Sequence, residues 1–142
     1  MERRPPGSTL LPSTTLIRAG TGESLVADDT VFTVNYSYPA GDGFEAGEGT
    51  VEVSADGTPV VVDGIPAGAV VTLNEATPAD ITGGTWSAPN FVDGNIVNVE
   101  KDATSEVELE NTIELNTGYL AIEKRIDGTG AALATPDEVY TV

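Results

Sequence analysis

The acidic side chains of this chain have the greatest capacity for chemistry, because histidine and cysteine are both absent. Without an imidazole or a thiol, the chain has no Ser-His-Asp or Cys-His nucleophile, no imidazole or thiolate zinc site and no disulfide. The 23 Asp and Glu residues could still supply a carboxylate pair for glycoside hydrolysis or oxygen ligands for calcium. The sequence gives no means of choosing a catalytic pair, so we expect that the protein is not an enzyme.

Calcium binding would use acidic residues close to predicted turns. The candidates are Asp28-Asp29, Asp42, Asp56 and Asp63. None of them falls in the alternating pattern of a calcium-binding loop. We therefore expect no metal site and no cofactor, and we interpret the acidity as a surface kept soluble by self-repulsion.

The charge balance also restricts the partners. The chain has 23 acidic and 6 basic residues, and Lys101 is the only basic residue between Ala19 and Glu123. We therefore expect neither nucleic acids nor anionic lipids as partners, since both are bound through Lys and Arg. No apolar run approaches the 18 residues needed to cross a membrane, so we expect no membrane insertion by this segment.

Most segments have the pattern of a β-strand. Apolar and polar residues alternate from Phe32 to Tyr38, from Thr50 to Ser54 and from Glu106 to Thr112. Further short strands are expected at 60–62, 70–75, 85–87, 90–92 and 96–99, separated by turn sequences such as Asp56-Gly57. Sixteen glycines and nine prolines punctuate the chain, and no useful helical periodicity is present. These features predict an all-β fold, a Greek-key β-sandwich of about seven strands.

The aromatic side chains could form a platform for a ligand, but their strand positions favour the core. Phe32, Tyr36, Tyr38, Trp86 and Phe91 are expected to point inward. Phe44 lies in a loop and is not assigned to the interior.

A short passage occurs twice at a constant spacing. Gly20-Thr21-Gly22 reappears as Gly128-Thr129-Gly130, 108 positions later, and five further identities keep the same offset up to Val34 and Val142. Such an offset is typical of tandem repeats of about one sandwich domain. We therefore predict a mobile arm at 1–13, one repeat unit at 14–117 and the opening strands of a second, truncated repeat at 118–142.

Three segments together resemble a known family. They are Val71-Thr72-Leu73-Asn74-Glu75-Ala76-Thr77-Pro78, Val107-Glu108-Leu109-Glu110-Asn111-Thr112 and Gly118-Tyr119-Leu120-Ala121-Ile122-Glu123-Lys124. In this order they resemble the Cna B-type, prealbumin-like repeats of Gram-positive surface proteins, in particular those of actinobacterial cell-wall proteins. The resemblance implies a prealbumin-like or immunoglobulin-like sandwich at the cell surface or in the cell wall.

The same resemblance implies an intramolecular isopeptide bond. In such domains a lysine of the first strand attacks an asparagine amide of the last strand, and a buried acid assists. Carried over to this chain, Glu75 is the assisting acid, Asn111 is the amide and Lys124 is the matching lysine. Lys124, however, belongs to the second, incomplete unit, and the corresponding residue of the first unit is Leu16.

Three explanations for Leu16 remain open. In the first, the unit is a degenerate one that is held by packing alone. Alternatively, Lys124 folds back into the place of the first strand and meets Glu75 and Asn111. In the third, Glu75 and Asn111 have an unrelated role, such as a solvated strand end and a turn.

The expected function follows from the repeat, the fold, the acidity and the resemblance. We predict a structural module of a cell-surface or cell-wall-attached protein, acting as a stalk or spacer, with the neighbouring repeats of the same chain as its partners. The alternative is an adhesin that contacts an extracellular protein or glycan through its loops, around Phe44 or at 79–84.

Overall fold

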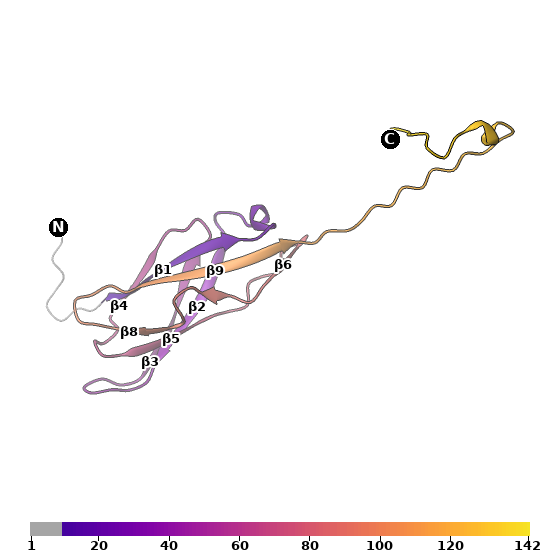
Figure 1. Ribbon diagram of the computed structural model, residues 1–142. Coiled ribbons are helices and arrows are strands. Elements are labelled where there is room, and N and C mark those ends of the chain that lie inside the picture. Colours follow the sequence, from indigo (N-terminus) through magenta and orange to yellow (C-terminus); the bar gives the residue numbers. More distant parts are fainter. Residues whose placement is uncertain (1–9) are drawn as a thin grey trace.

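The computed structural model describes residues 10–142, and it consists of two β-sheets packed face to face with a C-terminal segment outside them (Figure 1). The strands are β1 (Leu10–Ala19), β2 (Val31–Tyr38), β3 (Gly47–Ser54), β4 (Val60–Asp63), β5 (Val70–Glu75), β6 (Gly84–Trp86), β7 (Asn90–Phe91), β8 (Ile96–Asn98) and β9 (Glu106–Leu115). Two short 3-10 helices are η1 (Glu23–Leu25) and η2 (Ala131–Leu133). The prediction of an all-β sandwich is confirmed. The described residues form more strands than the seven expected. Three of these strands, β6, β7 and β8, have only two or three residues.

The two sheets have different strand orders. The first sheet has the order β4-β1-β9-β6, with β7 also paired to β9, and the second sheet has the order β3-β2-β5-β8. β1 begins at Leu10, inside the segment 1–13 for which the composition predicts a mobile arm, because Leu10 pairs with Asp63 of β4 across a bulge. Residues 1–9 of the predicted arm lie outside the described residues.

The core lies between the sheets and follows from the alternation within the strands. In β2, Phe32 and Val34 are buried, whereas Thr33 between them and Asn35 after them face outward. Burying every second side chain removes apolar surface from water while the polar face stays hydrated. The other core residues include Val53, Val71, Leu73, Leu109 and Ile113.

The aromatic rings pack against this core. Phe32 is fully buried, and the ring of Trp86 meets it edge to face at 5.6 Å between centroids. The indole Nε1 of Trp86 donates to the carbonyl oxygen of Ala79 at 3.0 Å. Phe44, which the sequence analysis does not assign to the interior, is half-buried and packs edge to face against Tyr38 at 6.2 Å between centroids.

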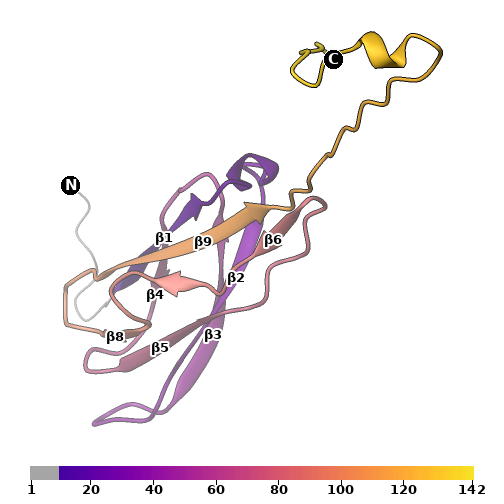
Figure 2. The ribbon, with the colours of Figure 1, turned by 45° about the vertical axis from the view of Figure 1, so that its right-hand side comes forward.

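The first and last strands of the sandwich are parallel neighbours. β1 and β9 pair in one unbroken register from Ser13 with Glu106 to Ala19 with Thr112. Two parallel neighbours have their starts at one end of the sheet and their finishes at the other. The chain therefore enters the sandwich at one pole and leaves it at the opposite pole, where β9 leads into the C-terminal segment (Figure 2).

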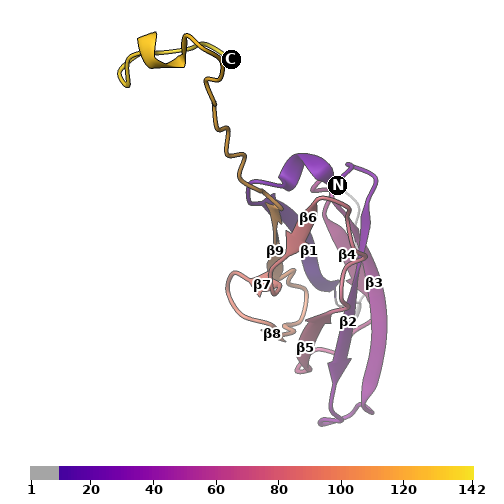
Figure 3. The ribbon, with the colours of Figure 1, turned by 90° about the vertical axis from the view of Figure 1, so that its right-hand side faces the viewer.

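The segment 116–142 extends away from the sandwich in each view (Figure 3). It contains no strand, and η2 is its one regular element. Large apolar side chains such as Tyr119, Leu120 and Leu133 are almost fully exposed there. The opening strands predicted for 118–142 are not formed, because a strand needs a neighbour for its backbone hydrogen bonds and none lies beside this segment.

Candidate functional site

Two of the three residues implicated by the sequence meet in the core. Glu75 is the last residue of β5 in the second sheet, and Asn111 lies in the middle of β9 in the first sheet. Both are at inward-facing positions, with 6% and 2% of their surface exposed. Asn111 Nδ2 donates a hydrogen bond to Glu75 Oε1 at 2.5 Å, so the pair joins the two sheets across the core.

The carboxyl group of Glu75 is in an unfavourable place for a charge. Burial raises its pKa above the ordinary value of 4.5, and the hydrogen bond from Asn111 opposes this shift only in part. Its second oxygen, Oε2, is buried and has no hydrogen-bond partner among the described residues. A protonated carboxyl group avoids the cost of an uncompensated buried charge. The pair is therefore a buried acid with a raised pKa beside an amide.

Leu16 occupies the strand next to this pair. It lies on β1, is 2% exposed and is in register with Leu109 of β9, two residues before Asn111. The β1 residue level with Asn111 is Arg18. The guanidinium of Arg18 is directed elsewhere, donating to the carbonyl oxygen of Val26 at 2.7 Å and pairing with Asp28 at 2.9 Å. Neither residue offers an amine to the acid and the amide.

Lys124 is separate from the other two site residues. It lies in the C-terminal segment, where its Nζ is 3.6 Å from the centroid of the Tyr140 ring, a cation–π contact. The position that a folded-back strand would need beside β9 is occupied by β1. The structure thus joins Glu75 to Asn111 but does not bring Lys124 to them.

A second group of contacts was not identified from the sequence, although its residues are those of the repeated motif. Thr21 accepts a hydrogen bond from the backbone N–H of Leu115 at 3.0 Å and donates its own hydroxyl to Glu114. Its backbone N–H also donates to Glu114 Oε2 at 3.1 Å, and Gly22 N–H donates to the carbonyl oxygen of Ile113 at 2.8 Å. We call Gly20-Thr21-Gly22 with the end of β9 the exit clamp. It fastens the turn after β1 to the point where the chain leaves the sandwich.

The clamp also has an electrostatic signature and a steric requirement. The hydrogen bonds from Thr21 lower the pKa of Glu114, because they stabilise its charged form. Gly20 has φ of +93°, and a Cβ atom there would collide with the carbonyl group of Ile113. The repetition of this motif could have indicated a structural role, since a Gly-Thr-Gly turn supplies a positive φ and a hydroxyl group.

The acidic residues do not gather into a metal site. Among residues 10–142, no group of three or more potential ligands is placed to hold a metal ion. Asp56 instead closes its own turn, accepting from the backbone N–H of Thr58 at 2.8 Å, and this bond lowers its pKa. No helix in the described part of the chain is long and apolar enough to cross a membrane.

The comparisons with known proteins agree with the extent of the sandwich. No curated protein matches the chain. Residues 13–114, from early in β1 to the penultimate residue of β9, match the family described as a domain of unknown function, DUF5979. Because the matched range covers well over half of the sequence, the chain belongs to this family.

Proposed function

We propose that the protein is a spacer module of a repetitive cell-surface or cell-wall-attached protein. The observation that carries this proposal is the parallel pairing of β1 with β9. It places the entrance and the exit of the chain at opposite poles. Modules joined end to end through such poles form an extended stalk, whereas modules with adjacent termini would fold back on one another.

The same pairing suits a module that bears tension. A pull on the two ends is directed along β1 and β9 in opposite senses, which loads the strands in shear. The hydrogen bonds between Ser13–Ala19 and Glu106–Thr112 then share the load, because none can break without the others being strained. Pulling the strands apart from one end would instead break the bonds one by one.

The exit clamp reinforces the pole at which the load is transmitted to the next part of the chain. Thr21 holds the backbone of Leu115 and the side chain of Glu114, the last two residues of β9. β6 supports the same end, since Gly84 pairs with Leu115. The last residues of β9 are thus held on both sides.

Local structure recurs at the offset of 108 positions. η1 begins at Glu23 and η2 at Ala131, and each follows a glycine with nearly the same dihedral angles, φ −96° and ψ 6° at Gly22 and φ −94° and ψ 3° at Gly130. Gly20 and Gly128 both have positive φ, +93° and +106°. This recurrence supports an array of similar modules. The net charge of −17 favours an extended array, because like-charged modules repel one another.

Force spectroscopy tests the proposal directly, since the absence of native cysteine allows specific attachment. One molecule is pulled through its N-terminus and Thr117→Cys, which shears β1 against β9. A matched molecule is pulled through Ser24→Cys and Thr117→Cys, which peels the strands apart from the exit pole. We expect a several-fold higher unfolding force in the shear geometry. Equal forces, or a weaker shear geometry, would refute a load-bearing spacer.

The loops offer less support for an adhesin. The ring of Phe44 packs against Tyr38, and the carbonyl oxygen of Ala79 accepts a hydrogen bond from Trp86. The aromatic groups of these two regions therefore serve internal packing. The spacer is therefore the function that we retain for the fold as a whole.

A further inference from the structure

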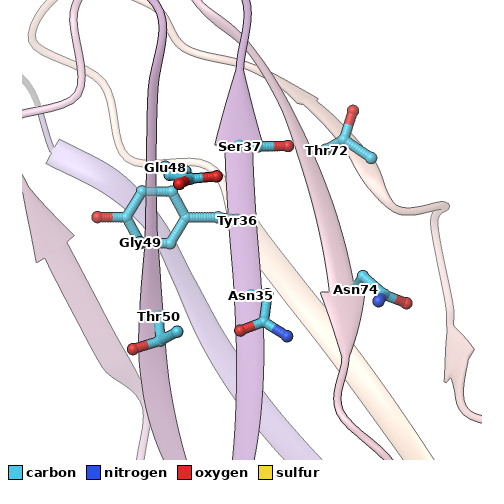
Figure 4. A pocket seen from close by; sticks show the side chains of 8 residues that line it. All are labelled: Asn35, Tyr36, Ser37, Glu48, Gly49, Thr50, Thr72 and Asn74. Atoms are coloured by element: carbon cyan, nitrogen blue, oxygen red, sulfur yellow. The ribbon is translucent and has the colours of Figure 1, made fainter.

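The outer face of the second sheet carries a groove of about 630 Å³. It lies over β3, β2 and β5, on the side opposite the core (Figure 4). We call its outward side chains the polar face: Asn35, Ser37, Glu48, Thr50, Thr72 and Asn74. Tyr36 and Gly49 complete the lining.

The strand register arranges the polar face in two rows. Asn35 of β2 is paired with Thr50 on one side and Asn74 on the other. Ser37, two residues along, is paired with Glu48 and Thr72. Paired residues of neighbouring strands point to the same face, about 5 Å apart, and successive rows are about 7 Å apart. The result is a regular grid of amide and hydroxyl groups.

The residue types of this grid are not those that stabilise a β-sheet. Asparagine is disfavoured in strands, yet Asn35 and Asn74 are directly opposite each other in the middle of the second sheet. Within the described residues, no side chain of the polar face makes a hydrogen bond to another protein side chain. Residues that contradict local propensity without an internal contact to compensate are typical of functional positions.

The ring of Tyr36 lies on the core side of the sheet, beneath the groove. Tyr36 extends from β2 toward β3 and lies against Gly49 (Figure 4). A Cβ atom at position 49 would collide with the ring, so glycine is needed there although it weakens a strand. Because Tyr36 alternates with Asn35 and Ser37 along β2, its ring packs against the core, and only the polar face is offered to a ligand.

The charge of the groove indicates the chemistry of its ligand. The chain as a whole carries a net charge of −17, but this grid contains only one carboxylate, Glu48. The net negative charge of the chain repels anionic ligands. A cationic ligand would be attracted more strongly to other, more acidic parts of the surface. Each amide offers both donors and an acceptor, and each hydroxyl offers one donor and two lone pairs, which matches a ligand rich in neutral hydroxyl groups.

From these observations we infer that the polar face binds an uncharged oligosaccharide, a role that goes beyond that of a spacer. Asn35 and Asn74 form the centre of the site and hydrogen-bond the sugar hydroxyls. Thr50 adds a contact in the row of the two asparagines, and Ser37 and Thr72 extend the contacts to the second row. The groove is open and shallow, so the affinity of a single module is modest, and an array of modules would bind through many such sites together.

The test is a titration of the full chain followed by NMR, with cellohexaose, mannohexaose and fully N-acetylated chitohexaose as separate probes. At least one probe is expected to shift the backbone amide signals of β2, β3 and β5 at concentrations up to about 10 mM. Asn35→Ala combined with Asn74→Ala should weaken that binding at least about tenfold. The matched control is Thr15→Ala with Thr112→Ala on the outer face of the first sheet, and it should leave the affinity unchanged.

A second pair of variants separates binding from folding. Asn35→Thr combined with Asn74→Thr gives β2 and β5 residues that favour strands, so it should keep or raise the thermal midpoint while the affinity still falls. The inference is overturned if none of the three hexasaccharides shifts these signals, or if the asparagine variants bind as well as the parent. It is overturned equally if a lysine-rich peptide, rather than any sugar, is the probe that shifts the polar face. None of these results bears on the unfolding force, so the spacer role is judged separately.

Discussion

Asn111 Nδ2 and Glu75 Oε1 lie 2.5 Å apart across the core, and their hydrogen bond is a polar link between the two sheets of the sandwich. The link is only half satisfied, because Glu75 Oε2 has no hydrogen-bond partner among the described residues. Such a pair has a measurable effect on stability, since its members are costly to bury and costly to separate.

The first prediction concerns pH. Burial raises the pKa of Glu75 above 4.5 in the folded protein, so the folded state keeps this proton at pH values where the unfolded state has lost it. The contribution of Glu75 to the unfolding free energy is therefore complete below pH 4.5 and is lost as the pH rises through the folded pKa. Glu75→Gln is neutral at every pH and should escape this loss.

The measurement is urea unfolding at several pH values between 4 and 8, followed by the fluorescence of Trp86, the only tryptophan. The stability of Glu75→Gln relative to the parent should increase with pH. The remaining acidic residues are common to both proteins, so their titration cancels in the difference. A difference that is constant across this range would show that the pKa of Glu75 is the same in the folded and unfolded states, so that burial does not raise it.

The second prediction separates the two partners. Asn111→Ala removes the donor and leaves a buried carboxyl group without a partner, which should lower the unfolding free energy by about 1–3 kcal/mol. Replacing both residues, Glu75→Leu with Asn111→Leu, removes the unpaired groups and should cost much less than the single change. Chemical denaturation of the three proteins gives the comparison. A double variant that is less stable than Asn111→Ala would contradict this account.

The third prediction concerns the position of Leu16. Leu16 is two residues before the level of Asn111 on the neighbouring strand, which places the two Cα atoms about 8 Å apart by strand geometry. The four-carbon stem of a lysine can span this gap. In Leu16→Lys, burial would favour a neutral amine beside Glu75, whose pKa burial raises. The Nζ–Cγ bond to Asn111 would then form, the Cγ–Nδ2 bond would break and ammonia would leave.

Intact mass spectrometry measures the outcome. Folded Leu16→Lys should be about 17 Da lighter than its sequence requires, through the loss of one ammonia, and Leu16→Lys with Glu75→Gln should have its full mass. The parent chain should also have its full mass, because Lys124 lies against Tyr140. If Leu16→Lys folds with its full mass, Glu75 and Asn111 are a packing pair without this reactivity.

The fold was predictable from local sequence signals. Alternation in β2 and β9 and the turn at Asp56-Gly57 are local features, and they place most of the strands. The short strands β6, β7 and β8 were expected as well, although their bounds were not, since two or three residues carry little periodicity. The start of β1 at Leu10 depends on pairing with β4, a distant contact that composition cannot reveal.

The site was predictable only in part. Glu75 and Asn111 were identified through a resemblance, and their burial follows from the inward phase of β5 and β9. The position of Lys124 could not be derived, because it depends on whether a neighbouring strand is available rather than on local sequence. The parallel register of β1 and β9, which places Arg18 rather than Leu16 level with Asn111, is also a property of the assembled sheet.

The last prediction compares two glycines at equivalent positions of the repeat. Gly20 and Gly128 both have positive φ, but Gly20 lies against the carbonyl group of Ile113, whereas no atom lies within 4 Å of the Cβ position at Gly128. Gly20→Ala should therefore lower the unfolding free energy of the sandwich by more than about 1 kcal/mol, through backbone strain and a clash in the exit clamp. Gly128→Ala should leave it unchanged, because the C-terminal segment does not pack on the sandwich. Urea unfolding of both variants decides the matter, and equal effects would mean that the clamp does not contribute to the stability of the sandwich.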